Sequence, residues 1–308
     1  MSESRLSTLI AENPFAAEAS KNAGQTAEPF SSVSSAAKSF SPAGQPLLSA
    51  RLTVDYPGKP GTLRDLSLDV RKGEVLGLIG QSGSGKSTIA LSIMRLLHLK
   101  GGKVSGSLSF QGRELLGLSE REMRRMRGRE IALVLQSPLS SLNPAMRIGK
   151  QLAEAWRAHA AGSAGECNRA IVEAISSVSL STDEEFLQRR PAQLSVGQAQ
   201  RVLIAMAIIH HPSLLIADEP TSALDVITQS EILALFRQLN RERGVSILYV
   251  SHDLASIANL CDRTAILHKG EIVECASTED IFCRPSHPYT RQLVAAQPKT
   301  PDSFTRDF

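Results

Sequence analysis

The sequence of 308 residues has few aromatic residues, little net charge and no long hydrophobic run. Aromatic residues make up 4% of the chain, and the formal net charge at pH 7 is +3. A charge this small argues neither for nor against a nucleic-acid partner. The longest apolar run, residues 202–209, is far shorter than the roughly 20 residues that a membrane-spanning helix needs. No N-terminal segment combines a basic start, an apolar core and a cleavage site, so we expect the protein to stay in the cytoplasm.

Cysteine is also scarce, and the 4 cysteines match no common zinc-binding spacing. We expect free thiols, which a reducing compartment permits. Residues 121–129 form an arginine-rich cluster that lacks interleaved aromatic residues and is offset by neighbouring glutamates. We interpret this cluster as a solvated helix face, and we expect no nucleic-acid partner.

Composition divides the chain into three parts. Residues 1–46 are rich in Ser, Ala, Gly and Pro and have too few large apolar residues to offset the entropy of ordering. They predict a poorly ordered leader, in which residues 6–12 could form a short helix. A dispensable tail is the favoured interpretation, and a binding role stays open. Residues 47–295 form the predicted α/β domain, and residues 296–308 form a C-terminal tail.

Within this domain, strand patterns at 47–54 and 63–70 flank a turn at 57–61 and predict a β-hairpin. A helix is predicted over 86 to about 98. Residues from about 145 to 193 have apolar residues at helical spacing and no clear strand, which predicts a helical insertion.

The segment around which the domain is organised is a glycine-rich loop between an apolar strand, residues 75–79, and an apolar helix. This order and spacing are typical of a P-loop, whose backbone N–H groups and helix N-terminus bind phosphate. Lys86 would reach the β- and γ-phosphates, and the Ser87 hydroxyl would bind Mg²⁺. The alternative is a loop that fits the pattern by chance. The predicted nucleotide-binding residues here are Gly80, Gln81, Ser82, Gly83, Ser84, Gly85, Lys86, Ser87 and Thr88.

A second apolar strand, residues 214–217, ends in Asp218 and Glu219. We expect this strand to lie beside the P-loop strand, so that Asp218 meets the Mg²⁺ shell near Ser87. Glu219 would polarise a water molecule for attack on the γ-phosphate, as a general base does. A helix start with two acids is the alternative, and Pro220 and the strand-like run disfavour it.

The segment Leu194-Ser195-Val196-Gly197-Gln198 opens a predicted helix over 198–210, where a hydroxyl and bare N–H groups favour anions. Here the sequence resembles the ATP-binding cassette (ABC) family, whose signature is usually Leu-Ser-Gly-Gly-Gln. The resemblance implies a head-to-tail dimer in which Ser195, Gly197 and Gln198 close over the ATP bound by the partner's P-loop. Val196 departs from the signature. We favour a side chain that points away from ATP over one that points inward and weakens this half-site.

The resemblance covers residues 47–295 and implies further roles. Tyr56 would stack on adenine, although an ordinary strand residue is the alternative. Gln136 would touch Mg²⁺ or the attacking water, and His252 would hydrogen-bond to the γ-phosphate. Asp225 would belong to a loop that crosses the dimer interface. The implied fold is α/β, a P-loop NTPase core of ABC type with an antiparallel β-hairpin subdomain and a helical subdomain at about 145–193.

Two segments, 139–146 and 286–290, resemble the importer ATPases for peptides and nickel. The cysteine-rich stretch of many such proteins is missing, so no iron–sulfur cluster is implied. The resemblance implies an ATPase that uses ATP and Mg²⁺ at the cytoplasmic face of the inner membrane. Its implied partners are a second ABC ATPase subunit, transmembrane permease subunits that the helical subdomain grips and, indirectly, a solute-binding protein.

Two other functions are alternatives to a transport ATPase. One is a soluble ABC ATPase attached to a cytoplasmic enzyme complex, such as a phosphonate-degrading assembly. The other is a P-loop enzyme unrelated to transport, such as a small-molecule kinase, which the signature segment and His252 disfavour.

Overall fold

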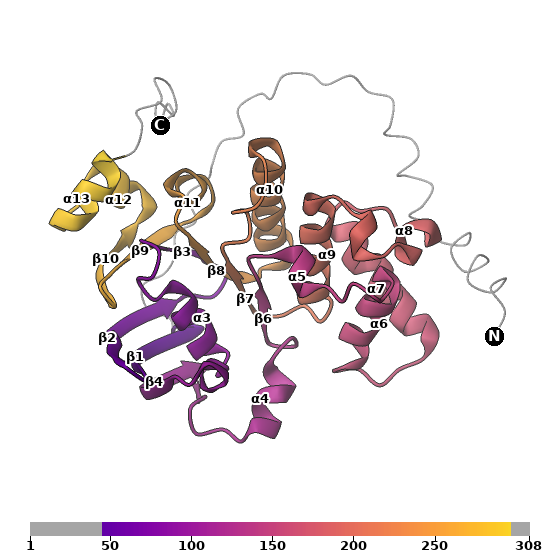
Figure 1. Cartoon of the computed structure of the whole chain (residues 1–308), viewed down its shortest axis with the longest axis horizontal. Helices are drawn as coiled ribbons and strands as arrows, with labels where there is room; N and C mark the ends of the chain where they lie inside the picture. Colours follow the sequence, from indigo (N-terminus) through magenta and orange to yellow (C-terminus); the bar gives the residue numbers. More distant parts are fainter. Residues whose placement is uncertain (1–44, 297–308) are drawn as a thin grey trace. The chain divides into compact units, whose positions relative to one another are not determined.

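Two β-sheets organise residues 45–296, which are the part of the chain that the computed structural model describes (Figure 1). The expectations for the leader, including a helix at 6–12, and for most of the C-terminal tail lie outside this range. The first sheet is antiparallel, with the strand order β2-β1-β4-β5. Its strands are β1 (Leu48–Tyr56), β2 (Lys59–Val70), β4 (Lys103–Phe110) and β5 (Arg113–Glu114).

The second sheet has the strand order β10-β9-β3-β8-β7-β6 and is parallel except for the β9–β10 pair. Its strands are β3 (Val75–Gly80), β6 (Ile131–Val134), β7 (Leu214–Asp218), β8 (Ser246–Ser251), β9 (Arg263–His268) and β10 (Glu271–Ser277). The prediction that β7 lies beside β3 is wrong. Both edges of β3 are hydrogen-bonded to other strands, β8 and β9, so β8 separates β7 from the P-loop strand.

Helices cover both faces of the parallel sheet. They are α3 (Lys86–Ile93), α4 (Glu120–Met126), α5 (Pro138–Ser141), α6 (Ile148–Arg157), α7 (Ala164–Ser177), α8 (Glu184–Gln188), α9 (Val196–Ile208), α10 (Val226–Arg243), α11 (Leu254–Leu260), α12 (Thr278–Cys283) and α13 (Pro288–Ala295), with 3₁₀ turns at Leu97–Lys100 and Pro191–Gln193. No helix within the described range is long and apolar enough to cross a membrane.

Alternation along β7 shows how the core is divided. Leu215 and Ala217 pack in one apolar cluster with residues of α6, α7, α9 and α10, whereas Leu214 and Ile216 pack in a second cluster with the antiparallel sheet and α3. Successive side chains of a strand point to opposite faces, so a parallel strand buried on both faces reads as a continuous apolar run. In Figure 1 the antiparallel sheet and the helices α6–α9 accordingly lie on opposite sides of the parallel strands.

The predicted helical insertion is confirmed as a segment of helices, because residues 145–193 contain α6, α7, α8 and a 3₁₀ turn and no strand. Its apolar face is buried, with Ile148 and Leu152 at 0% exposure and Trp156 at 9%. Ser163 begins α7 with a reciprocal capping box to Glu166, which satisfies backbone N–H groups that a helix start leaves free.

Two predicted boundaries in the N-terminal half differ from the structure. The turn expected at 57–61 is shorter, because β2 already begins at Lys59 and pairs with Tyr56. The helix expected to reach about residue 98 ends at Ile93. There Arg95 adopts a left-handed backbone conformation with φ of 50°, and its guanidinium donates to the carbonyls of Leu115 and Leu118. These distant hydrogen bonds stabilise a break that local helical propensity does not predict.

Candidate functional site

The P-loop joins β3 to α3, and close contacts at two of its positions require glycine. Gly85 precedes α3 with φ of 109°, and a Cβ atom there would lie 2.7 Å from Leu63 Cδ2. A Cβ atom on Gly80 would lie 2.8 Å from the carbonyl oxygen of Leu267. Glycine fits both positions because it has no Cβ atom to make these close contacts, and at Gly85 it also adopts the positive φ readily. The backbone is thereby free to turn around a phosphate at the start of α3.

An open cavity of about 400 Å³ lies over this loop. Its volume falls in the range of small-molecule sites, about 300–1,000 Å³. Nine of the predicted residues line it: Tyr56, Ser82, Gly83, Gly85, Lys86, Ser87, Thr88, Gln136 and Glu219. The structure adds Lys59 and Thr62, which the sequence pattern does not predict because both lie between the two predicted strands, whereas β2 already begins at Lys59.

Glu219 is the residue on which the predicted catalytic side chains converge. Its carboxylate lies 3.1 Å from His252 Nδ1 and 3.4 Å from Lys86 Nζ. It also accepts a hydrogen bond of 3.3 Å from the side-chain amide of Gln136. Glu219 has φ of 48°, an uncommon conformation for a residue with a side chain, and its N–H donates to the carbonyl of Val250 on β8. Strand β8 thus fixes the backbone from which this carboxylate projects.

Lys86 is buried at the base of the cavity, with 6% exposure. Its ammonium donates to the carbonyls of Gly80 at 2.7 Å and Gln81 at 3.2 Å, in addition to its ion pair with Glu219. Three further predicted residues of the loop do not line the cavity: Gly80, Gln81 and Ser84. Ser84 donates its N–H to the Gln81 carbonyl, and its hydroxyl packs against Gly80.

Asp218 ends β7 next to this network and is 9% exposed. Burial raises the pKa of its carboxyl group, and a hydrogen bond with the Ser87 hydroxyl opposes that rise. One carboxylate oxygen, Oδ1, is buried and has no hydrogen-bond partner within the described residues. An unpartnered oxygen beside a serine hydroxyl suits Mg²⁺, which prefers oxygen ligands and is often held by one or two carboxylates together with substrate phosphates. These residues therefore fit the ion.

Tyr56 contributes the wall of the cavity formed by the antiparallel sheet. It is the last residue of β1, and its phenolic oxygen lies 3.4 Å from Thr88 Oγ1 on α3. The ring is thereby fixed at the mouth of the phosphate loop, where a planar base can reach it.

The signature residues lie elsewhere. Ser195 begins α9 in a capping box with Gln198, in which each donates its backbone N–H to the other side chain at 3.1 Å. Asp225 begins α10 and accepts from the N–H and hydroxyl of Thr228. These hydrogen bonds hold the pKa of the Asp225 carboxyl below its usual range. A Cβ atom on Gly197 would lie 2.6 Å from Thr228 Cγ2, so the two helix starts are in contact.

None of Ser195, Gly197, Gln198 and Asp225 lines the cavity above the P-loop of the same chain. The predicted nucleotide-binding residues thus form two separate groups on one molecule. Val196, which departs from the signature, has 37% of its surface exposed, and Val226 and Ile227 at the adjacent start of α10 are exposed by 82% and 75%.

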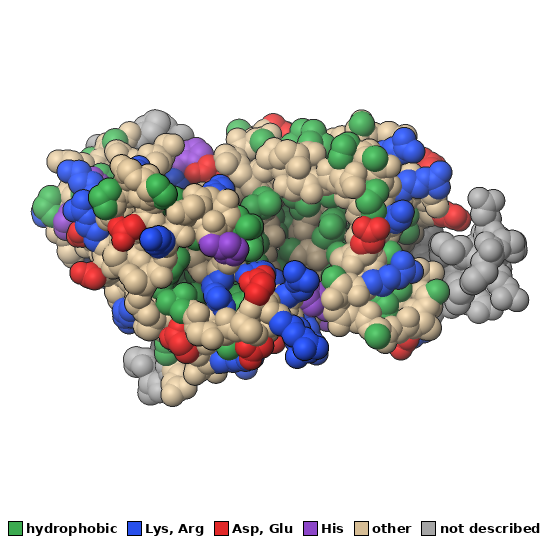
Figure 2. All heavy atoms as spheres, turned by 60° about the horizontal axis from the view of Figure 1, so that its bottom comes forward, with side chains coloured by type: hydrophobic (Ala, Val, Ile, Leu, Met, Phe, Trp, Pro, Cys, Tyr) green, Lys and Arg blue, Asp and Glu red, His purple; other side chains and the backbone are tan. Residues whose placement is uncertain are grey.

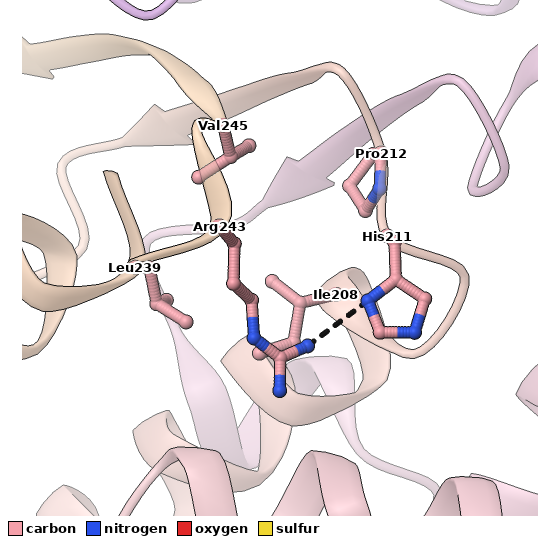
Figure 3. A pocket seen from close by; sticks show the side chains of 6 residues that line it. All are labelled: Ile208, His211, Pro212, Leu239, Arg243 and Val245. Atoms are coloured by element: carbon pink, nitrogen blue, oxygen red, sulfur yellow. Dashed lines mark hydrogen bonds between the residues drawn. The ribbon is translucent and has the colours of Figure 1, made fainter. Parts of the chain in front are cut away.

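A second cavity holds no more than about 20 Å³ and lies between the end of α9, the end of α10 and the residues that follow these two helices (Figure 3). In it Arg243 and His211 Nδ1 form a hydrogen bond of 3.1 Å. A space of this size accommodates about one water molecule. The cavity over the P-loop is therefore the candidate site.

Comparisons with known proteins agree with this geometry. The family profile described as ABC transporter matches residues 63–222. The chain is 43% identical over 251 residues to a probable peptide ABC transporter ATP-binding protein of Sinorhizobium fredii, a match that covers 80% of this chain and 75% of that protein. It is 41% identical over 244 residues to an oligopeptide transport ATP-binding protein of Bacillus subtilis, covering 79% and 68%.

A solved structure is also similar to this chain. It is a dimeric post-hydrolysis state of the ATP-binding cassette MJ0796 bound to ADP and Pi, with a TM-score of 0.64 and 27% identity over 75% of this chain and 98% of that chain. The cavity, the P-loop and these matches together define an ATP-binding cassette. The chain belongs to the ABC transporter family, and it is one of the family's ATPases. The predicted family and fold class are confirmed.

Proposed function

We propose that this chain hydrolyses ATP to power a membrane importer for peptides, nickel or a related small solute. The observation that carries the proposal is the convergence of Lys86, Gln136 and His252 on the Glu219 carboxylate, at the edge of a cavity built on the P-loop. The relatives named above, which are ATP-binding proteins of peptide transport, support the choice of solute class.

Nucleotide binding uses three parts of the cavity. Adenine stacks on Tyr56, and the phosphates lie against the N–H groups of the P-loop and the start of α3. The Lys86 ammonium exchanges its carbonyl contacts for the β- and γ-phosphates. Ser87, Asp218 and Gln136 would hold Mg²⁺ through their side-chain oxygens, and the ion would neutralise phosphate charge.

Hydrolysis depends on the side chains around Glu219. The carboxylate accepts a proton from the attacking water as that water approaches the γ-phosphate. Gln136 and His252 already lie within 3.3 Å and 3.1 Å of Glu219, so they can orient this water and hydrogen-bond to the phosphate from the same position.

A complete site needs a second ABC subunit, identical or similar to this one. The P-loop and the signature segment are separate groups on this molecule, so Ser195, Gly197 and Gln198 act on the nucleotide that the partner binds. Asp225 lies at the start of α10, which contacts Gly197 through Thr228, and it crosses the same interface. Closure on ATP and opening after hydrolysis then form a two-state cycle.

The permease docks on the helical subdomain at about 145–193, close to Gln136. Leu135 and Leu139 flank this glutamine, and each has 44% of its surface exposed. Figure 2 shows a face of the molecule hollowed at its middle, with hydrophobic side chains inside the hollow and Lys and Arg side chains along one margin. An apolar hollow with a charged margin suits a protein partner. The chain would then lie at the cytoplasmic face of the membrane. A solute-binding protein would determine which solute is transported.

Purification of the tagged chain from membranes of its host tests this function. We expect a co-purifying protein with several membrane spans and ATP hydrolysis that depends on Mg²⁺. A soluble enzyme as the stoichiometric partner would contradict the importer and favour an ABC ATPase of a cytoplasmic enzyme complex.

A further inference from the structure

Hydrogen bonds to strand β10 hold the segment Ser286–Thr290 in place. The transport function does not explain the role of this segment. The carboxylate of Glu274 accepts the backbone N–H groups of Ser286 at 2.7 Å and His287 at 3.0 Å. Partial burial raises the pKa of the Glu274 carboxyl, but hydrogen bonds from these backbone N–H groups contribute to lowering it below its usual range. His287 in turn accepts the N–H of Tyr289 and begins α13. One carboxylate thus fixes the position of this helix start.

Tyr289 connects this helix start to the neighbouring strand. Its ring lies against His268, the last residue of β9, with 3.7 Å between ring centroids and 30° between ring planes. Its phenolic oxygen is buried and has no hydrogen-bond partner within residues 45–296. The ring, rather than the hydroxyl, therefore makes the contact.

The turn after His268 lies against the nucleotide cavity. Lys269 and Gly270 have φ of 49° and 86° and join β9 to β10 in a two-residue hairpin loop. A Cβ atom on Gly270 would lie 2.5 Å from the carbonyl oxygen of Thr62, which lines the cavity. The carbonyl of Gly270 accepts the N–H of Arg64 at 3.0 Å.

Strand β9 also supports the phosphate loop itself. Leu267, the residue before His268, pairs with Gly80, and its carbonyl oxygen is one of the atoms that leave no room for a Cβ on that glycine. Leu267, near the end of β9, thus contacts Gly80, the first residue of the P-loop. Gly270, in the hairpin loop, contacts Thr62 at the rim of the cavity. A displacement of this strand end would therefore move both the first residue of the P-loop and the cavity rim at Thr62.

We propose that Tyr289 is a positioning residue for nucleotide binding. By stacking on His268, Tyr289 holds the β9–β10 loop against Thr62 and the end of β9 against Gly80. The segment Ser286–Thr290 thereby stabilises the position of cavity residues that it does not itself adjoin. The proposal rests on nucleotide binding above the P-loop, and it concerns affinity rather than the chemical step, because Tyr289 does not line the cavity.

The test compares the affinity for Mg·ADP, measured by titration calorimetry, with the steady-state kinetics of ATP hydrolysis. In Tyr289→Ala we expect ADP binding to weaken about tenfold, which equals about 1.4 kcal/mol, with KM for ATP rising and kcat within about twofold. Tyr289→Phe keeps the ring and should bind like the wild type. Gln292→Ala changes an exposed residue of the same helix and is the matched control.

Tyr289→Leu, which keeps apolar bulk without the ring, replaces the alanine variant if that protein does not fold. Unchanged ADP affinity in a folded Tyr289→Ala or Tyr289→Leu protein would overturn the proposal, as would a fall in kcat alone. Tight ADP binding by the wild type is required first, and its absence would instead contradict the nucleotide site itself.

Discussion

The Lys86 ammonium lies 3.4 Å from a carboxylate oxygen of Glu219, and both side chains are largely buried. The cation that a P-loop offers to phosphate is thus paired, within this chain, with the acid that would activate water. Phosphate must compete with Glu219 and with two backbone carbonyls for the same ammonium. We therefore expect nucleotide binding and the position of the Glu219 carboxylate to be coupled through this ion pair.

Replacing Lys86 should weaken nucleotide binding without unfolding the loop. In Lys86→Ala we expect the Kd for Mg·ADP to rise at least about tenfold, because a hydrogen bond to a charged group contributes about 1.5–3 kcal/mol. Calorimetric titration measures this, and Lys72→Ala, an exposed lysine before β3, serves as the control. Equal affinity in the Lys86 variant and the wild type would remove Lys86 from the site.

His159 should make the stability of the fold depend on pH. Burial lowers its pKa, and the nearby His210 and Arg129 lower it further, whereas a backbone hydrogen bond at Arg127 opposes them. The His159 and His210 rings lie 5.2 Å apart. A histidine whose folded pKa is depressed contributes stability above its unfolded pKa, about 6.5, and that stability is lost as pH falls through the lower folded value.

Urea unfolding between pH 7.5 and pH 5 measures this dependence. The free energy of unfolding should fall toward acid pH, and the slope should be shallower in His159→Gln, which keeps a neutral polar side chain. His98→Gln, in the 3₁₀ turn after α3, is the control for a general loss of one histidine. Identical slopes for the wild type and His159→Gln would show that burial of this ring is not linked to protonation.

Gly197 should tolerate no side chain, whereas Val196 next to it should. Gly197→Ala places a Cβ atom 2.6 Å from Thr228 Cγ2 and is expected to destabilise the fold by about 1–3 kcal/mol through overpacking. ATP hydrolysis should fall, while ADP binding by the chain's own P-loop stays intact. Val196→Ala alters an exposed side chain, and we expect hydrolysis within about twofold of the wild type if Val196 points away from ATP.

Two measurements decide between these outcomes. Thermal unfolding separates the packing cost at Gly197 from any effect on catalysis, and the rate at saturating ATP reports the signature segment. A large gain in activity in Val196→Gly would mean that the valine faces the nucleotide and weakens its half of the composite site.

Local patterns predicted the parts of the site that are contiguous in sequence. The apolar run before Gly80 indicates a strand, and the glycines up to Gly85 indicate a loop that leads into a helix. Such local signals are readable because strands and helices space their apolar residues differently and glycine interrupts both. The same holds for Asp218 and Glu219 at the end of a short apolar strand. The structure places these segments together at the carboxyl ends of the parallel strands β3 and β7.

Pairings between distant strands could not be read from sequence. The position of β8 between β3 and β7 depends on long-range backbone hydrogen bonds, which leave no periodic signal in either strand. The contribution of Thr62 to the cavity depends on the register of β2, and the end of α3 depends on hydrogen bonds from Arg95 to residues about twenty positions away. The stacking of Tyr289 on His268 is likewise a tertiary contact.

The hydrolysis rate of Glu219→Gln tests the central claim most directly. The variant keeps the hydrogen-bonding shape of the side chain but removes the base, so ATP turnover should fall by about 10²–10⁴-fold. Mg·ADP should bind at least as tightly as in the wild type, because the negative charge beside Lys86 is gone. Turnover at the wild-type rate, measured as phosphate release at saturating ATP, would contradict the assignment of Glu219 as the general base.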